Sequence, residues 1–394
     1  MTHAHAAAPG ARPALPLGNR IDFSDEQAML LDTAEAFCRE RSPIRAVRAR
    51  LGTQPGHDPA VWREMTELGW CGLAVPEALG GSGLGLAELA TLVEPMGRHL
   101  MATPFVSSQL AVQALLAGDD AALQQTWLPR LAQGAVGTVA LFEDDGDWNL
   151  MAPACTAQAQ GGQLRLAGRK TLVADAIGAD LVLVSVLLDG EPALVALSAA
   201  DLPAERLHPE IVIDETRRCA AITLDGLVIP AAAALTGEAA RAALEAVRRA
   251  ALLLLSAEAA GGLAGALAVV VDYLNLRTAF GRKIGSYQSL KHACADMLVG
   301  LERARSHVRH AASLLAAGEN AEIALRMAKV EAGDSFVFAG DRAVQFHGGF
   351  GFTWECDAQL YLRRALWLQA AFGDAAHHRR HLADLLLGPL SRAT

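Results

Sequence analysis

The chain has 394 residues, of which 52% are hydrophobic and 20% are charged, so a soluble protein of two or three domains with an ample core is expected. Its formal net charge of −9 argues against nucleic acid or an anionic membrane surface as the main partner and favours a small-molecule ligand. The six cysteines lack the paired spacing of a zinc site or a redox dithiol, which fits reduced thiols and a cytoplasmic location.

The N-terminal part divides into a tail and a helical domain. Residues 1–20 are rich in Ala, Pro and His and lack the basic start and apolar run of a secretory signal, so a disordered tail is expected. Residues 21–135 predict a helical domain, because Ser24 is followed by a plausible capping sequence and apolar residues recur near helical spacing. The segment V-P-E-A-L-G-G-S-G at 75–83 is dense in turn formers and marks a loop.

The residue pattern of the sequence changes after residue 135 and again after residue 232. Residues 136–232 contain short β-branched runs, such as L-V-L-V-S-V at 181–186, separated by Gly and Asp, which predicts a β domain. Residues 233–394 return to long Ala/Leu helices, with Thr236 and Gly237 as an entry signal. The predicted fold class is therefore mostly α with a central β domain.

One apolar stretch could be mistaken for a membrane span. Residues 250–271 are almost unbroken hydrophobic sequence and match the roughly 20 residues that cross a bilayer. Glu258 and four glycine or serine residues interrupt the stretch, however, and no other span accompanies it. These features favour a helix buried on all sides within a bundle, and no membrane span is assigned.

Motifs in the second half of the chain carry a family resemblance. They are R-T-A-F-G-R-K-I-G-S-Y-Q at 277–288, K-H-A-C-A-D-M at 291–297 and A-V-Q-F-H-G-G-F-G-F-T-W-E at 343–355. Together with the 75–83 loop, they resemble the acyl-CoA dehydrogenase family, and the resemblance covers nearly the whole chain. It implies an N-terminal helical domain, a middle β-barrel and a C-terminal four-helix bundle.

The same motifs supply candidate FAD-binding residues. The guanidinium of Arg277 suits a phosphate pair, an aromatic at Phe280 can cover a flat ring, and Gln288 offers both a donor and an acceptor. Taken alone, such an arginine is more often a solvated helix end, and a Gly-Gly pair more often a loop. The resemblance implies that these three residues contact one FAD and that another protomer completes the site with Gln345, Gly348 and Gly349, which implies a homo- or hetero-oligomer, either a dimer or a tetramer.

The chemistry implied by the resemblance is α,β-dehydrogenation of an acyl-CoA, in which a carboxylate removes the α-proton. Most members carry this glutamate at the position of Phe372 and others at that of Ala251, so both usual places lack a carboxylate here. A positioned base is worth about 10² to 10⁴ in rate. Asp374 and Glu258 are the remaining candidates; alternatively, Asp374 is a polar residue at a helix start and Glu258 is an acid paired within its apolar helix.

Other family features are partly kept. Phe372 still supplies a backbone N–H, which in the family donates to the thioester carbonyl, so this contact is expected to survive. Leu172 and Ala174 stand where many members place Trp and Thr against the flavin ring, and residues 138–146 replace the usual turn over it. These departures resemble a bacterial subgroup, some of whose members work as unlike pairs in which one chain supplies the carboxylate.

Three functions remain open on this basis. The chain is either an FAD-dependent acyl-CoA dehydrogenase of lipid or steroid catabolism that passes electrons to an electron-transfer flavoprotein, or a non-catalytic or FAD-sharing partner subunit of such an enzyme, or a flavin-dependent monooxygenase on the same fold. No metal is assigned, because His377, His378 and His381 stand beside two arginines in a pattern typical of a solvated helix surface.

Overall fold

The computed structural model describes residues 23–388, so the predicted tail lies outside the described residues. The N-terminal part is helical, and its first helix begins at a capping box in which Ser24 Oγ accepts from Gln27 N and Gln27 Oε1 accepts from Ser24 N, both at 3.1 Å. The predicted loop at 75–83 is confirmed and contains one short 3-10 helix. The helices are α1 (Asp25–Arg41), α2 (Ile44–Arg50), α3 (Pro59–Glu67), α4 (Leu86–Arg98), α5 (Phe105–Gly118) and α6 (Ala121–Ala132).

Two sheets follow. The larger sheet has the order β10-β6-β5-β2-β3-β9, with β1 paired in parallel to β5, and the smaller has the order β4-β8-β7. β5 is central to the larger sheet and its first six residues are buried, which explains why its sequence is continuously apolar. The strands are β1 (Gly137–Ala140), β2 (Thr156–Gln160), β3 (Gln163–Ala167), β4 (Arg169–Ala174), β5 (Leu181–Leu188), β6 (Glu191–Ser198), β7 (Leu207–Glu210), β8 (Cys219–Thr223), β9 (Val228–Pro230) and β10 (Ala234–Leu235).

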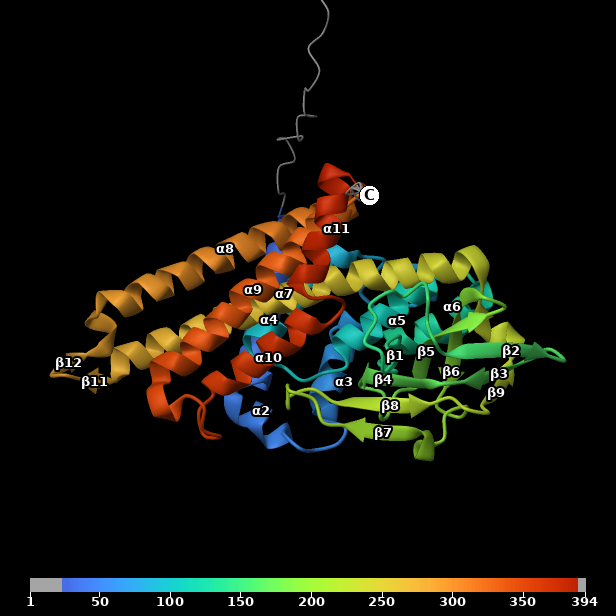
Figure 1. Ribbon diagram of the computed structural model, residues 1–394, viewed down its shortest axis with the longest axis horizontal. Coiled ribbons are helices and arrows are strands. Elements are labelled where there is room, and N and C mark those ends of the chain that lie inside the picture. Colours follow the sequence, from blue (N-terminus) through green and yellow to red (C-terminus); the bar gives the residue numbers. More distant parts are fainter. Residues whose placement is uncertain (1–22, 389–394) are drawn as a thin grey trace, which may run out of the picture.

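A helical bundle completes the chain, so the predicted fold class is confirmed. A hairpin of β11 (Thr278–Ala279) and β12 (Arg282–Lys283) joins the first two bundle helices. In Figure 1 this hairpin lies at one end of the molecule and the β domain at the other, with α10 between them. The bundle helices are α7 (Gly237–Leu276), α8 (Gln288–Ala316), α9 (Glu322–His347), α10 (Ala358–Ala370) and α11 (Ala375–Leu387).

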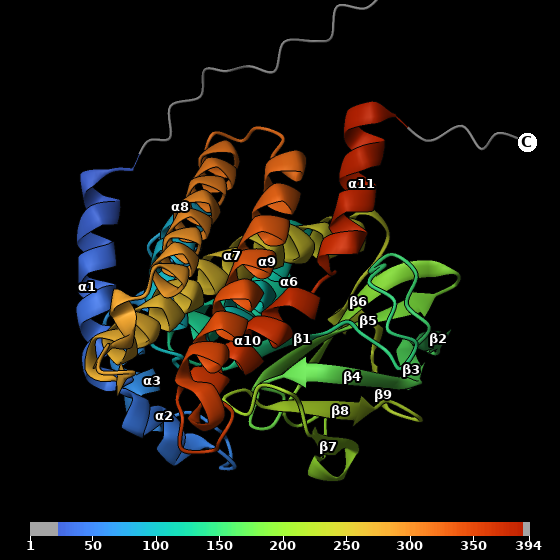
Figure 2. The same ribbon diagram turned by 60° about the vertical axis from the view of Figure 1, so that its left-hand side comes forward.

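Helix α7 is the apolar stretch noted in the sequence. It is long and apolar enough to span a membrane, yet 72% of its most apolar segment is buried inside the molecule, as in a core helix. Glycines allow α4 to approach it closely: a Cβ on Gly97 would lie 2.1 Å from Glu258 O, and one on Gly261 would lie 1.8 Å from Glu94 O. Gly261, one of the interruptions that argued against a membrane span, is therefore a packing position. Figure 2 shows α7 running behind α8, α9 and α10.

Candidate active site

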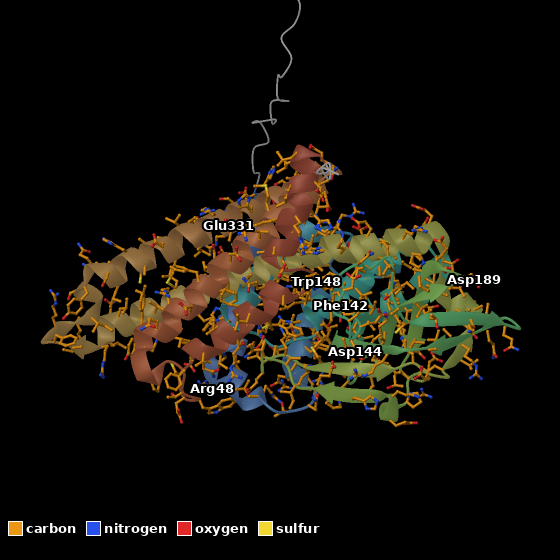
Figure 3. The ribbon with its side chains drawn as sticks, in the orientation of Figure 1. Arg48, Phe142, Asp144, Trp148, Asp189 and Glu331 are labelled. Atoms are coloured by element: carbon orange, nitrogen blue, oxygen red, sulfur yellow. The ribbon has the colours of Figure 1, made fainter. Side chains whose placement is uncertain are left out.

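A largely apolar cavity of about 300 Å³ lies where the β domain meets the helices. Its outer part is more exposed, with Leu172 at 42% exposure, whereas its inner part is formed by buried residues such as Leu110 and Leu255. Figure 3 shows Phe142 and Trp148, two of its lining residues, at the junction between the β domain and helices α10 and α11. The cavity draws on strand β4, helices α5, α7 and α10, and the segment after β1.

Phe372 closes one side of the cavity, on the turn between α10 and α11. Its φ is 57°, and the ring packs edge-on against Phe142 with the ring centroids 5.1 Å apart. Among residues 23–388, no backbone or side-chain acceptor takes the N–H of Phe372. The turn therefore presents an uncommitted amide donor beside an apolar cavity.

A buried lysine holds this turn in place. Lys329 Nζ, on α9, donates to three backbone oxygens of the turn region, those of Leu368, Gln369 and Gly373, at 2.8, 3.0 and 3.1 Å. Burial lowers the pKa of Lys329 to about 7, against the opposing charge of Asp374. Lys329 thereby fixes the backbone on both sides of Phe372.

Asp374 acts as the N-cap of α11 in this structure. Its Oδ1 accepts from His377 N at 2.7 Å, the usual use of an aspartate at a helix start. This is the structural alternative considered for Asp374 from the sequence. Its assignment as a catalytic base stays a prediction, and Asp374 is not among the residues that line the cavity.

Glu258 is only 2% exposed and is held by two arginines. Its Oε1 accepts from both Arg217 and Arg364. Arg364, which is fully buried, also pairs with Asp214 and donates to Thr216. Ala251, the other usual position of the family base, is buried as well. Glu258 is thus paired within its apolar surroundings, the alternative that the sequence left open for it.

Glu143, a carboxylate that lines the cavity, is also paired. Glu143 accepts from Lys170 Nζ at 2.6 Å, and Lys170, fully buried, also donates to Ser185 Oγ. Burial alone would raise the pKa of Glu143, but hydrogen bonds from Ala154 N and from Lys170 bring it below its ordinary value. Glu143 is therefore an ionised structural anchor for the segment that carries Phe142.

Comparison with known proteins places this arrangement in a family. Models described as the N-terminal and C-terminal domains of acyl-CoA dehydrogenase match residues 24–135 and 239–387. The acyl-CoA dehydrogenase IpdE2 of Mycolicibacterium smegmatis is 31% identical over 363 residues, which cover 91% of this chain and 98% of that protein. The chain belongs to the acyl-CoA dehydrogenase family.

Solved structures agree with this membership. A steroid acyl-CoA dehydrogenase named for two polypeptides, Tcur3481 and Tcur3483, is 29% identical, with a TM-score of 0.81 over 92% of this chain and 98% of that one. A chain of the ChsE4–ChsE5 complex of Mycobacterium tuberculosis shares the fold, at 24% identity, with a TM-score of 0.85 over 95% of this chain and 100% of that one. The chain is thus an oxidoreductase of the acyl-CoA dehydrogenase type, and its cofactor is FAD.

The chain's residues fit FAD at two separate places. An uncommitted amide and an apolar cavity suit the flat ring and its substrate. The predicted phosphate-side residues lie elsewhere, at the hairpin end of the bundle and at the end of α9, where all are exposed: Arg277, Phe280, Gln288, Gln345, Gly348 and Gly349. Phe280, at the hairpin turn, has a φ of 52° and is 94% exposed. These residues are therefore accessible at the surface of the chain.

Several residues of the site were missed in the sequence. Arg364 and Lys329 are cationic residues within helices, and both are buried. Nothing in the sequence around them distinguishes a buried cation from one at the surface. The solvated surface expected for the histidines near the C-terminus is wrong in part, because His378 is only 1% exposed. A signal was available for Glu258 alone, since an acid in so apolar a helix requires a partner.

Proposed function

We propose that the cavity binds an acyl-CoA thioester whose carbonyl oxygen accepts from the N–H of Phe372. The observation that carries this proposal is the uncommitted amide of Phe372, a residue that lines the apolar cavity and stands on a turn fixed by Lys329. A preorganised donor at that position stabilises negative charge on the carbonyl oxygen as the α-proton leaves. FAD, when bound, supplies the acceptor for the β-hydride, and an electron-transfer flavoprotein is the proposed next electron carrier.

The proposed enzyme is an oligomer in the cytoplasm. Its FAD phosphates are contacted by Arg277 and Gln288, and a second protomer adds Gln345 and the Gly348–Gly349 pair. Support comes from the exposure of all these residues and from the place of the β11–β12 hairpin at the end of the molecule opposite the β domain (Figure 1). Exposed apolar side chains accompany them on the bundle, namely Leu276, Phe280, Phe350, Phe352 and Trp354.

A second candidate function is that of a partner subunit that needs another chain's carboxylate. The observation favouring it is that Glu258 is held by two arginines and Asp374 caps a helix. In an enzyme that acts alone, one of these two carboxylates would have to leave its structural contacts and accept the substrate proton. The steroid acyl-CoA dehydrogenase named for two polypeptides supports a paired arrangement.

Placing a carboxylate at residue 372 tests both candidates. The variant Phe372→Glu restores a base where most of the family has one, and we expect it to accelerate flavin reduction by acyl-CoA by about 10² to 10⁴, the usual worth of a positioned base. The measurement is anaerobic bleaching of flavin absorbance with a panel of acyl-CoAs. Phe372→Gln is the matched control, since it keeps size and polarity without a carboxylate.

The remaining variants separate the outcomes. If the wild type already bleaches rapidly and Asp374→Asn or Glu258→Gln abolishes bleaching without unfolding the protein, the chain carries its own base and the partner proposal fails. If wild type and Phe372→Glu are both inert while acyl-CoA binds, Phe372 does not lie beside the α-carbon. Oxygen consumption by the reduced flavin without any acyl-CoA would favour a monooxygenase.

A further inference from the structure

Asp175 places a carboxylate on the wall of the cavity at which the flavin ring is expected. It directly follows Ala174, the last residue of β4, and both residues line the cavity together with Leu172. The side chains of Leu172 and Ala174 carry no polar atom, so neither can form a hydrogen bond with a bound ring. Asp175 is therefore the polar side chain that this strand offers to the cofactor.

The two carboxylates that line the cavity differ in how fully they are paired. Glu143 accepts hydrogen bonds with both oxygens, from Lys170 Nζ and from the backbone N–H groups of residues 154 and 155. Asp175 accepts with Oδ2 only, from Ser107 Oγ at 2.7 Å. Between residues 23 and 388, no group donates to Asp175 Oδ1 and no side chain forms an ion pair with Asp175. One acceptor of Asp175 is thus left without a donor.

This acceptor is open, and the residue that carries it is held in place. The fully buried side-chain atoms without a partner include Arg217 Nε and Glu258 Oε2, but Asp175 Oδ1 is not among them, and Asp175 is partly exposed. The backbone of Asp175 is in the left-handed region, with a φ of 55°, and its N–H donates to Arg218 O at 2.9 Å. Its backbone and Ser107 therefore fix the carboxylate on the cavity wall.

The surroundings of Asp175 leave its negative charge only partly compensated. Burial raises the pKa of Asp175, whereas the hydrogen bond from Ser107 and the charge of Arg217 lower it. Arg217 forms its ion pair with Glu258, whose own charge raises the pKa of Asp175. A further donor at Oδ1 would favour the ionised carboxylate and would remove the cost of an unpaired acceptor.

We propose that Asp175 Oδ1 accepts a hydrogen bond from the N3–H group of the flavin ring, which makes Asp175 a cofactor-binding residue. The oxidised ring has a single N–H group, at N3, and its other nitrogens and its carbonyl oxygens are acceptors. An ionised carboxylate is an acceptor only, so it can pair with that donor alone. Ser107 acts through Asp175 as a positioning residue. This inference rests on the flavin-dependent function proposed above and concerns the cofactor, not the acyl group.

The test compares the binding of FAD with that of N3-methyl-FAD, which lacks the N3–H donor. Calorimetry measures both affinities for the full-length apoprotein, in the oligomeric form in which it purifies. We expect the wild type to bind FAD about 10-fold more tightly than the methyl compound, the equivalent of about 1.4 kcal/mol for one net hydrogen bond. Asp175→Gly should abolish this preference, and glycine adopts the φ of 55° without strain. Ser107→Ala, which frees the carboxylate to rotate, should reduce the same preference.

Asp189→Asn is the matched control, because it removes a carboxylate from the exposed turn between β5 and β6, away from Phe142 and Trp148 of the cavity (Figure 3). It should keep the wild-type preference. Equal binding of the two flavins by the wild type, or a preference that survives in Asp175→Gly, overturns the inference but leaves the acyl-CoA proposal intact. Failure of the folded wild type to bind either flavin overturns both the inference and the flavin-dependent function.

Discussion

Two buried polar clusters flank the cavity, and they are stabilised in different ways. In the first, Glu258 and Asp214 pair with Arg364, so opposite charges neutralise one another. In the second, Lys329 has no ion-pair partner within 4 Å among residues 23–388 and is satisfied by backbone carbonyls instead. The first cluster joins the β domain to α7 and α10, and the second holds one turn.

The difference predicts how each cluster responds to substitution. Removing one member of a charge-paired cluster strands an opposite charge in the interior, and such a charge is costly. Removing a cation that is held by neutral carbonyls leaves only carbonyl oxygens without a donor. It also removes the free-energy cost of burying the cation. The two clusters should therefore contribute different amounts to the free energy of unfolding, although both are buried.

The largest effect is expected from Arg364→Met, which leaves Glu258 and Asp214 short of a partner. We expect it to lower the free energy of unfolding by about 3–5 kcal/mol, the range for breaking a buried ion pair. Urea unfolding measures this value. Arg363→Met is the matched control, because the neighbouring Arg363–Glu215 pair is about one-third exposed and should matter by less than about 1 kcal/mol. Equal losses in the two variants would contradict the charge-pairing argument.

The variant Lys329→Met is expected to lower the free energy of unfolding by a smaller amount. The variant removes three hydrogen bonds but also a desolvated cation, so we expect a net loss of about 2 kcal/mol. Hydrogen exchange should rise locally at the turn around Phe372, and acyl-CoA affinity should fall with it. Lys291→Met, at an exposed position on α8, is the control. A loss as large as that of Arg364→Met would mean that the two clusters are equivalent.

These clusters also show where sequence reasoning stops. The order of domains followed from local signals: Ser24 as a cap, the β-branched run of β5, and the apolar length of α7. Each of these is a property of neighbouring residues. The site depends instead on pairs far apart in the chain, such as Arg364 with Asp214, and no local periodicity reports such a pairing.

Glu258 and Asp374 illustrate this limit. Both are candidates because the reaction needs a carboxylate, and the sequence shows only which acids lie near the right position. Whether an acid is available depends on its partners, Arg217 and Arg364 for one and the N–H of His377 for the other.

The second cluster, around Lys329, should also differ from the first in the pH dependence of its stability. His378 is buried beside Lys329 and Arg326, and its Nδ1 accepts from Arg326 Nη1 at 3.1 Å, so the imidazole is neutral. Burial, together with these two cations, lowers the pKa of His378 to about 3, whereas an unfolded histidine titrates near 6.5. The folded-state value is depressed, so the stability from His378 is fully present above pH 6.5 and is lost as the pH falls toward 3.

We therefore expect the wild type to lose stability between pH 6.5 and 4 more steeply than His378→Gln, by up to about 1.4 kcal/mol per pH unit. Urea midpoints across that range measure the difference. His381→Gln, an exposed position on the same helix, should keep the wild-type slope. If His378→Gln also keeps the wild-type slope, the imidazole is protonated in the folded state. The cluster would then contain three adjacent cations, and carbonyl oxygens alone would have to stabilise them.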